Sequence, residues 1–591
     1  MFAKSTTLKT IKTTIKCALY STKPSYIHKL GDQPLKYITI GQLLQETASK
    51  FGDRKAVISV HQNEFLTFSE LLQKADKLAA AFKNLNLEKG DRLGLWVPNM
   101  VEWYVTKMAS ARAGLITVCL NPVFEAPEIE YCVNKTGIKA LVCADEFKHH
   151  DYYESLLTIA PELENCDPGK LKSTKVPSLK TVIRIGEENK RGTYNFGEIL
   201  DRANSSEVAN IAKLQHMISP DDGCSLYFTS VLFPSHSVKY LFHESFQGTT
   251  GKPKVALTTH FKLVNSAFFT GKRLQLSSKH HKLCAQVPLF HIYGTVVGIM
   301  AALNHASTIV LPTNGYQPSK TLDAIKNEKC TVIYGTPTMY TDLIQIQEKR
   351  TDPIAAEIAV IGGAPVTPYL IQQISETLNV TKVHPMYGIT ECSGAVFESV
   401  PTESETNHAP VEYVEDHFEV KVINESGGVV PFGTAGELCV KSYSTMVGYW
   451  EDEEKTNEIL GRDGWLKTGD QFILEEDGSG RVVGRLKDVI IRGGQNIFPK
   501  EIEEFLVTHP NILDVQVIGT PHTRLGEEVC ACITIKPQSH LTLEDIATFC
   551  KGKLAYFKIP SRMEIFDNFP KTVSGKIQKF KLKEILSEKN L

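Results

Sequence analysis

Long apolar segments are missing from this sequence of 591 residues. No run of 18 or more apolar residues occurs, and the nearest approach, residues 296–311, is interrupted by Asn304 and His305. A membrane-spanning helix is therefore not expected. A strong charge of either sign is missing too, because the formal net charge is −2 and the pI is near 6.8. This balance does not favour a nucleic-acid partner.

Paired cysteines are also missing. The 13 cysteines are scattered singly, without a CxxC pair, and Cys530 and Cys532 are spaced so that a strand would place both on one face. This pattern excludes a zinc site of the usual spacing and a disulfide framework of the small-domain type. It favours free thiols in a reducing compartment.

Acidic residues are absent before Asp32, whereas lysine, serine and threonine are frequent there. Apolar residues recur in this segment at spacings of three and four, which predicts a basic amphipathic helix: Phe2, Leu8, Ile11, Ile15 and Leu19. We interpret residues 1–31 as a mitochondrial presequence; the alternative is a disordered basic tail. The C-terminal Lys-Asn-Leu differs from the peroxisomal Ser-Lys-Leu signal.

The length predicts two or more domains. After Asp32, short apolar runs alternate with amphipathic stretches, as in layered α/β proteins. Residues 92–97 and 115–119 are predicted strands on either side of a helix over residues 102–113.

Two further apolar runs, residues 331–334 and 358–361, are followed at once by glycine or proline. Strands of open parallel sheets end in this way at their ligand sites. Residues 436–484 are rich in glycine and predict a small β-rich module.

The last hundred residues form a separate pattern, and we expect a domain boundary near residues 484–488. Strands are predicted at residues 515–518 and 531–535, and helices at residues 501–507 and 543–554.

Two short segments have the composition of a phosphate-binding loop: Tyr227-Phe228-Thr229-Ser230 and Gly248-Thr249-Thr250-Gly251-Lys252-Pro253-Lys254. Glycines and small hydroxyl residues let backbone N–H groups surround an anion, and a lysine adds a point charge. The loop is not of the Walker A type, because the glycine spacing differs and Pro253 stands where Ser or Thr would hold magnesium.

The joined string YFTS…GTTGKPK resembles the signature of the ATP-dependent adenylate-forming superfamily, which includes acyl-CoA synthetases, luciferases and peptide-synthetase adenylation domains. The resemblance covers about residues 38–580, because the other motifs of that family follow in order. They are PLFHIYG at 288–294, YGTPT at 334–338, GGAP at 362–365, YGITE at 387–391, GWLKTGD at 464–470, GRLKD at 484–488 and KTVSGK at 571–576. Several C-terminal segments, among them IIRGGQNIFPKEIEEFL, look most like the mitochondrial medium-chain acyl-CoA synthetases.

The resemblance implies a fold with a large α/β N-terminal domain, residues 32–486, and a small mobile α+β C-terminal domain, residues 487–591. The large domain would comprise two layered α/β subdomains and a small β-barrel-like module.

The resemblance also implies the nucleotide site. Tyr387 and Gly388 would contact adenine, and Asp470 and Arg485 would bind the ribose. The remaining nucleotide and coenzyme A contacts would come from Thr229, Ser230, Gly248, Thr249, Thr250, Gly251, Lys252, Pro253, Lys254, Gly362, Gly363, Ala364, Pro365, Arg492, Gly493 and Gly494.

Four residues would carry the catalysis. Glu391 would hold Mg²⁺ against the phosphates, with Thr390 as a hydroxyl donor. His291 would lie near the acyl carboxylate, and Lys576 would bring a cation to the reacting oxygens. Lys487 would be the hinge between the domains. Three of these residues have a plainer alternative: Glu391 as a surface carboxylate, His291 as a core histidine and Lys576 as a solvated lysine.

The implied reaction has two halves and uses ATP, Mg²⁺ and coenzyme A. A fatty acid carboxylate attacks the α-phosphorus of ATP, which releases pyrophosphate and leaves an acyl-adenylate; the thiol of coenzyme A then attacks this mixed anhydride. No protein nucleophile is needed, because the carboxylate is itself the nucleophile. The expected partners are these small molecules.

The insert between the two loop segments, residues 231–247, departs from the family pattern. It begins with Val231, whose codons start with GT, and ends with Gln247, one of whose codons is CAG. Its length of 17 codons keeps the reading frame, so we interpret it as a retained short intron. Removing it restores YFTSGTTGKPK.

Two other functions remain open from the sequence. If the insert belongs to the native protein, the chain is a catalytically impaired homologue that binds nucleotide or acyl groups. The second is an adenylate-forming ligase for another carboxylic acid, such as an aryl or amino acid. No Gly-Gly-x-Ser carrier segment follows residue 580, which places the second below the first.

Overall fold

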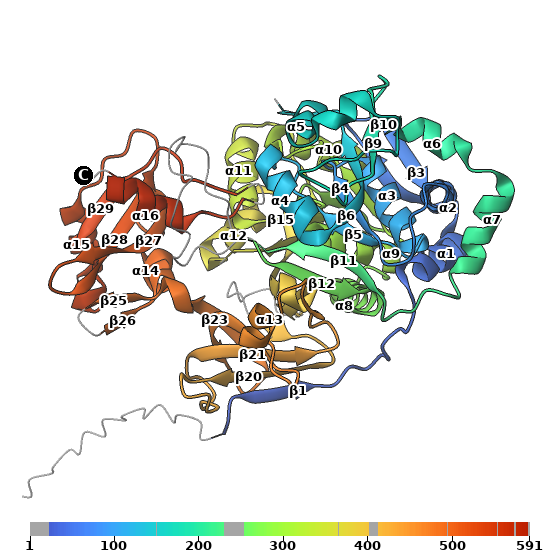
Figure 1. Ribbon diagram of the computed structural model, residues 1–591. Helices are drawn as coiled ribbons and strands as arrows, with labels where there is room; N and C mark the ends of the chain where they lie inside the picture. The colour runs from blue at the N-terminus through green and yellow to red at the C-terminus, as the bar shows by residue number, and fades with distance from the viewer. Residues whose placement is uncertain are drawn as a thin grey trace, which may run out of the picture.

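The computed structural model describes residues 23–148, 150–229, 253–364, 366–400, 412–492, 495–551, 553–572 and 575–588. In these residues two large sheets and one small sheet carry the fold (Figure 1). None of the described helices is both long enough and apolar enough to cross a membrane.

The first large sheet has eight strands. In spatial order these are β10 (Thr193–Asn195), β9 (Thr181–Ile185), β6 (Ile138–Ala144), β4 (Arg92–Trp96), β5 (Ile116–Cys119), β11 (Gly223–Phe228), β12 (Val255–Thr259) and β22 (Gly448–Tyr449). Strands β10 to β11 pair in parallel, and β12 pairs antiparallel with β11.

The second large sheet has 14 strands and continues into the small β-rich module. Its order is β1 (Tyr26–Lys29), β20 (Phe418–Ile423), β21 (Gly436–Ser442), β23 (Leu466–Leu474), β24 (Ser479–Arg485), β19 (Glu412–Val414), β18 (Gly394–Glu398), β17 (Val380–Ile389), β16 (Ala356–Gly362), β15 (Val332–Gly335), β13 (Lys282–Ala285), β14 (Thr308–Leu311), β2 (Lys55–Ser59) and β3 (Glu64–Thr67). The run β17 to β2 is parallel, so the carboxyl ends of β15, β16 and β17 meet at one edge.

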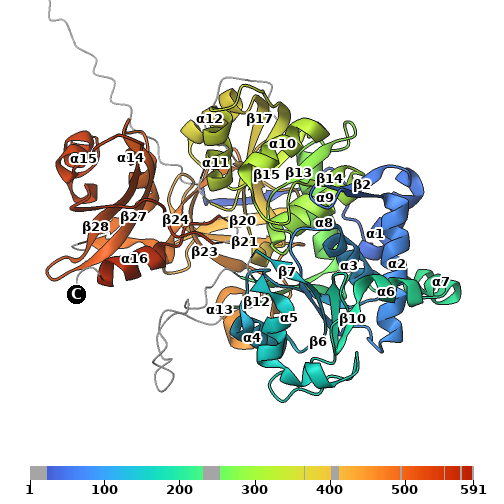
Figure 2. The same cartoon turned by 90° about the horizontal axis from the view of Figure 1, so that it is seen from above.

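Helices fill the space between the two large sheets, as Figure 2 shows from above. They are α1 (Ile40–Phe51), α2 (Phe68–Asn84), α3 (Val101–Arg112), α8 (His260–Arg273), α9 (Ala301–Asn304) and the π-helix η2 (Tyr293–Met300). The largest buried cluster joins Leu93 of β4 and Leu283 of β13 with these helices, so the two sheets share one core.

Other helices cover the outer faces. The eight-stranded sheet packs against α4 (Ala126–Thr136) and α5 (Tyr152–Ile159), and the parallel strands of the 14-stranded sheet pack against α10 (Pro318–Glu328), α11 (Pro337–Gln347) and α12 (Pro368–Thr377). Among the described residues before 486, the other α-helices are α6 (Phe196–Arg202), α7 (Ser205–Leu214) and α13 (Glu453–Ile459).

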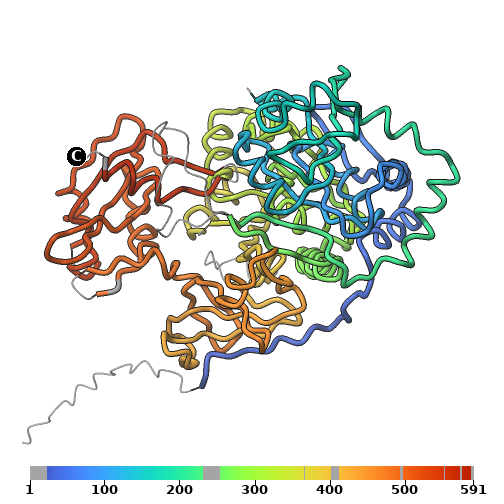
Figure 3. The backbone as a smooth tube through the Cα atoms, viewed as in Figure 1, coloured from blue at the N-terminus to red at the C-terminus, as the bar shows by residue number. Residues whose placement is uncertain are grey.

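The chain then passes through the short helix η4 (Leu486–Asp488) into a third sheet, as the tube in Figure 3 shows. This sheet contains β26 (Gln495–Ile497), β25 (Ile490–Arg492), β28 (Gly526–Ile535), β27 (Ile512–His522) and β29 (Arg562–Ile565). It packs against α14 (Pro499–Leu506), α15 (Leu543–Cys550) and α16 (Lys579–Glu588). The expected fold class, a large layered α/β part followed by a small α+β part, is confirmed.

The N-terminal boundary needs a correction. Residues 26–29 form β1, which pairs antiparallel with β20, and Asp32 forms an ion pair with Lys272 of α8. Cleavage after residue 31 would therefore remove an edge strand of the sheet. The N–H of Phe432 donates to the oxygen of Lys23 at 3.1 Å, and the N–H of Ser25 donates to the oxygen of Val430 at 2.7 Å. A cleaved targeting segment that ends before Lys23 would leave these contacts in place.

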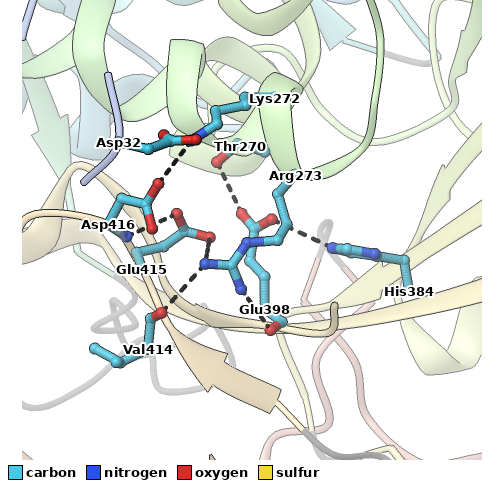
Figure 4. A network of polar contacts seen from close by, with 9 residues as sticks. All are labelled: Asp32, Thr270, Lys272, Arg273, His384, Glu398, Val414, Glu415 and Asp416. Carbon is cyan, nitrogen blue, oxygen red and sulfur yellow. Dashed lines mark hydrogen bonds and ion pairs between the residues drawn. The ribbon is translucent and has the colours of Figure 1, made fainter. Parts of the chain in front are cut away.

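A buried polar network joins α8 to the corner between β18 and β19 (Figure 4). The Arg273 guanidinium donates to the backbone oxygens of Glu398 and Val414, at 3.2 Å each, and lies 3.5 Å from the Glu415 carboxylate. The Glu398 side chain, which is fully buried, accepts from the Thr270 hydroxyl at 2.8 Å.

Burial and the neighbouring Glu398 charge raise the pKa of Glu415 to about 8, and Arg273 opposes this rise. When the pKa of a carboxyl is higher in the folded than in the unfolded protein, the free energy of unfolding decreases as pH rises from the unfolded-state pKa to the folded-state pKa. Here that window runs from about 4.5 to about 8.

We expect Arg273→Met to lower the unfolding free energy by about 3 kcal/mol at pH 8, because it leaves buried carboxylates without their cation. The loss of unfolding free energy should be smaller at pH 6, because the buried carboxylates are protonated more easily there. Urea unfolding followed by tryptophan fluorescence measures this, since all four tryptophans, Trp96, Trp103, Trp450 and Trp465, lie in the larger part of the chain.

Two further variants control this experiment. Arg273→Met with Glu415→Gln should recover at least half of the loss. Lys279→Met removes an exposed ion pair with Glu357 and should cost about 0.5 kcal/mol or less. Equal losses for Arg273→Met and Lys279→Met would contradict the assigned role of the network.

Candidate active site

Strand β17 carries two of the predicted nucleotide residues to its carboxyl end. Tyr387 is half-buried, with its ring 5.9 Å from that of Phe472 and 6.4 Å from that of Phe397. Gly388 follows at a register shift, where a Cβ would lie 2.2 Å from the backbone oxygen of Gly394. Only glycine fits there, so the β17–β18 turn that presents Thr390 and Glu391 depends on it.

Asp470 lies at the centre of the site. Its buried carboxylate accepts a hydrogen bond from the Tyr387 hydroxyl at 2.7 Å and lies 3.1 Å from Nε of Arg485. Asp470 and Arg485 are opposite each other in the β23–β24 pair. The lone pairs left on the two carboxylate oxygens suit hydroxyl donors.

Glu391 has a partner that the sequence analysis did not identify. The Tyr449 hydroxyl donates to Oε1 of Glu391 at 2.7 Å, and Nζ of Lys254 lies 4.9 Å from the Tyr449 ring centre. Tyr449 lies in β22, far from Glu391 in the sequence. Only its position between Gly448 and Trp450 could have marked it as a site residue. Thr390 begins the short helix that holds Glu391.

The ends of the phosphate loop lie side by side. The backbone N–H of Thr229 donates to the oxygen of Lys254 at 2.9 Å, and the oxygen of Pro253 accepts from the Tyr131 hydroxyl at 3.2 Å. The other predicted loop residues, Ser230, Gly248, Thr249, Thr250, Gly251 and Lys252, and the insert itself lie outside the described residues.

Lys576 reaches the site from the C-terminal sheet region. Its Cε lies 3.5 Å from the point where Gly363 would carry a Cβ, and Gly363 has a φ of +86°, so a side chain there would be strained and would meet the lysine. Gly362 is the last residue of β16, and Gly363 and Ala364 come next in the chain. Pro365 lies outside the described residues.

Burial, followed by the Arg485 charge, lowers the pKa of Lys576 to about 8, and the Asp470 and Glu391 charges oppose this shift. The ammonium of Lys576 is therefore within electrostatic reach of three other predicted site residues.

His291 also lies within reach of Lys576. Burial, followed by the Lys576 charge, lowers the pKa of His291 to about 3, so the ring is neutral at physiological pH. Nδ1 accepts from the backbone N–H of Tyr293 at 3.2 Å, which leaves the proton on Nε2. The π-helix η2 begins two residues after His291, at Tyr293, and π-helical turns are frequent at functional sites.

Two predicted positions lie in or near the linker to the third sheet. Lys487 is exposed in η4, between β24 and β25. Nη1 of Arg492 donates to the oxygen of Phe557 at 2.7 Å within the C-terminal part, so the structure does not group Arg492 with Lys576. Gly493 and Gly494 lie outside the described residues.

The structure thus groups Tyr387, Asp470, Arg485, Glu391, Lys576 and His291 around the carboxyl ends of β16 and β17. A half-buried ammonium within electrostatic reach of two carboxylates and a guanidinium can hold an anionic substrate and stabilise negative charge that develops on it. Thr336 and Thr338 also contact the Lys576 turn and were not identified as site residues, although both belong to the YGTPT segment.

The comparisons with known proteins agree with this geometry. The AMP-binding enzyme family matches residues 44–450, and the AMP-binding enzyme C-terminal domain matches residues 501–576. The chain is 38% identical over 580 residues to the mitochondrial medium-chain acyl-CoA ligase ACSF2 of Danio rerio, covering 96% of this chain and 93% of that protein. It is 40% identical over 573 residues to the Bos taurus protein of the same name, covering 95% and 90%.

Solved structures share the fold. The anthranilate CoA ligase AuaEII in complex with anthranoyl-AMP superposes with a TM-score of 0.78 at 23% identity, covering 95% of this chain and 99% of that one. ATP-bound MatB from Rhodopseudomonas palustris superposes with a TM-score of 0.75 at 24% identity, covering 92% and 98%. From the full-length sequence matches and the grouped site residues, this chain belongs to the AMP-binding enzyme family.

Proposed function

We propose that this protein is an ATP-dependent acyl-CoA synthetase that converts a medium-chain fatty acid to acyl-AMP and then to acyl-CoA. The observation that carries the proposal is the meeting of Lys576, from the C-terminal part of the chain, with the larger part. Its Cε lies 3.5 Å from the position of a Cβ on Gly363, and its ammonium is within electrostatic reach of Asp470, Arg485 and Glu391. The relatives named medium-chain acyl-CoA ligase support the substrate class. ATP and coenzyme A are the co-substrates of such ligases.

In the first half-reaction the fatty acid carboxylate attacks the α-phosphorus of ATP, and pyrophosphate leaves. As the carboxylate oxygen bonds to phosphorus it gives up its charge, and negative charge builds on the α-phosphate oxygens and the departing pyrophosphate. The Lys576 ammonium is placed to orient the carboxylate and to stabilise the charge on the α-phosphate oxygens. His291 is neutral and keeps a proton on Nε2, so it donates a hydrogen bond to the acyl carboxylate without adding charge. The work of these residues is alignment and charge stabilisation.

The nucleotide would be held by the residues grouped around Asp470. Tyr387 and Gly388 border the base, Asp470 and Arg485 meet the ribose hydroxyls, and the loop that ends at Thr229 and Lys254 surrounds the phosphates.

The donor set near the phosphates fits Mg²⁺. The carboxylate of Glu391 and the hydroxyl of Thr390 are hard oxygen ligands, and Mg²⁺ is commonly held by one or two carboxylates together with substrate phosphates. When bound, the ion neutralises phosphate charge and favours departure of pyrophosphate. The hydrogen bond from Tyr449 orients the Glu391 carboxylate for this role.

In the second half-reaction the thiol of coenzyme A attacks the acyl-adenylate and AMP leaves. We propose that rotation at Lys487 withdraws Lys576 and brings the Arg492–Gly494 segment to the site. The exposed position of Lys487 between two separate sheets is compatible with such a hinge. The same change of sheet supports a division into a large domain that ends at residue 486 and includes β1, and a small domain over residues 487–591.

We also propose a mitochondrial location, in the matrix, with a targeting segment that ends before Lys23. The basic, acid-free N-terminus and the mitochondrial relatives support it.

The insert supports one second candidate, an impaired homologue that binds nucleotide without releasing pyrophosphate. Residues 231–247 separate Thr229 and Ser230 from the glycines that would share a phosphate with them.

A deletion separates the two candidates. The chain without residues 231–247 should release pyrophosphate from ATP with octanoate and then form octanoyl-CoA, whereas the full chain should be at least 100-fold slower in pyrophosphate release (on the order of the loss of one charge-stabilising group). Equal activity of both forms would show that the loop tolerates the insert. ATP binding without turnover by either form, with acetate, octanoate or palmitate, would favour the impaired homologue.

The ionisation of Lys576 predicts a pH profile. Because its pKa is about 8, the ammonium is lost as pH rises through 8, and the rate of pyrophosphate release by the active form should fall there. Lys576→Arg should be slower at pH 7 but lack this decline, since a guanidinium stays protonated. A wild-type rate that stays constant from pH 7 to 9.5 would contradict the role of Lys576.

A further inference from the structure

The turn that carries Lys576 is closed by its own hydrogen bonds. The backbone N–H of Thr572 donates to the oxygen of Lys576 at 2.7 Å, and the N–H of Gly575 donates to the oxygen of Thr572 at 2.9 Å. The N–H of Lys576 donates to the Thr572 hydroxyl at 3.0 Å, and Lys571 pairs with Ile577. The main chain at Lys576 therefore moves with the turn as one piece.

This turn rests directly on the first turn of α11, on the side of the larger domain that faces the C-terminal part in Figure 1. The hydroxyl of Thr338 donates to the backbone oxygen of Gly575 at 3.0 Å. A Cβ on Gly575 would lie 2.8 Å from the Thr336 hydroxyl oxygen, and Gly575 has a φ of +81°, so glycine permits the close approach.

Thr336 and the rest of α11 are fixed in place. The Thr336 hydroxyl caps the helix by accepting from the N–H of Met339 at 3.4 Å. Met339 and Leu343 are buried against the sheet, whereas Thr338 and Asp342 are half-buried. The turn of Lys576 thus meets a rigid surface.

We propose that Thr338 is a positioning residue for Lys576: through Gly575 it holds the lysine turn against the larger domain while the adenylate forms. The inference rests on the proposed function for its catalytic meaning, but the contact itself does not depend on activity. One hydrogen bond from a half-buried threonine is weak enough to open again for the thioester step.

The test compares Thr338→Val with Thr338→Ser and Thr341→Val in the full chain. Valine removes the hydroxyl with little change of shape, and serine restores it. Thr341 lies on the same helix and donates to the oxygen of Pro337 within it, so Thr341→Val is the matched control.

The first readout is hydrogen–deuterium exchange of peptides spanning residues 571–577, which reports docking whether or not the enzyme turns over. Thr338→Val should exchange about fivefold faster there, as expected for the loss of one net hydrogen bond, whereas Thr338→Ser and Thr341→Val should match the wild type. Wild-type exchange in Thr338→Val overturns the proposal, and so does acceleration of equal size in Thr341→Val.

The second readout measures the two half-reactions separately, with whichever form of the chain, with or without residues 231–247, is active. Thr338→Val should lower kcat for pyrophosphate release about fivefold with KM for ATP unchanged. The conversion of supplied octanoyl-AMP and coenzyme A to octanoyl-CoA should not slow. Equal slowing of both half-reactions overturns the positioning role. If no form turns over while the exchange difference persists, the proposed function fails and the α11 contact stands.

Discussion

The buried carboxylate of Asp470 joins the parts of this active site. It accepts from Tyr387 at the end of β17 and pairs with Arg485 at the end of β24, so it joins the parallel sheet to the small β-rich module. Its charge, with that of Glu391, also favours the ammonium form of Lys576 against the effect of burial. Without this carboxylate the site would hold two adjacent cations, Arg485 and Lys576, whose mutual repulsion would disfavour the docked C-terminal turn.

The network around Arg273 supports the same site by holding strand β18, which leaves it. Glu398 ends β18, the strand that returns from Glu391, and its corner with β19 is held by the Arg273 guanidinium (Figure 4). Buried charges of this kind add little net stability compared with apolar packing. They do fix the direction in which β18 leaves the site, because removing one partner leaves another charge without compensation. The position of Glu391 therefore depends on residues that touch no substrate.

The sequence predicted those features that local patterns determine. The strand at residues 92–97 corresponds to β4, and the helix at 102–113 to α3, within one residue at either end. The helix predicted over 543–554 was too long: it ends at Cys550, because Lys551 has an extended ψ of 126° and a glycine follows in the sequence. Apolar spacing continued past that point, but backbone conformation ended the helix.

Motif order selected segments that the structure brings near one another, because each motif is local. Contacts between distant segments left no such signal. The hydroxyl of Tyr449 on Glu391 and the hydroxyl of Thr338 on Gly575 each depend on how separate elements pack, and threonine or tyrosine in a loop carries no mark of its partner. The strand β1 was missed for the same reason. Residues 26–29 alternate too weakly to be distinguished from a basic tail, and only their pairing with β20 makes them a strand.

The predicted phosphate loop is a case where distant residues meet for a local reason. Thr229 and Lys254 have 24 residues between them and are hydrogen-bonded because β11 and β12 pair as a hairpin. Lengthening the loop of such a hairpin from seven residues to 24 costs only about 1 kcal/mol in closure entropy. This small cost predicts that the fold tolerates residues 231–247, whereas the proposed phosphate binding would be sensitive to them, because it would require Ser230 and Gly248 to reach one anion together.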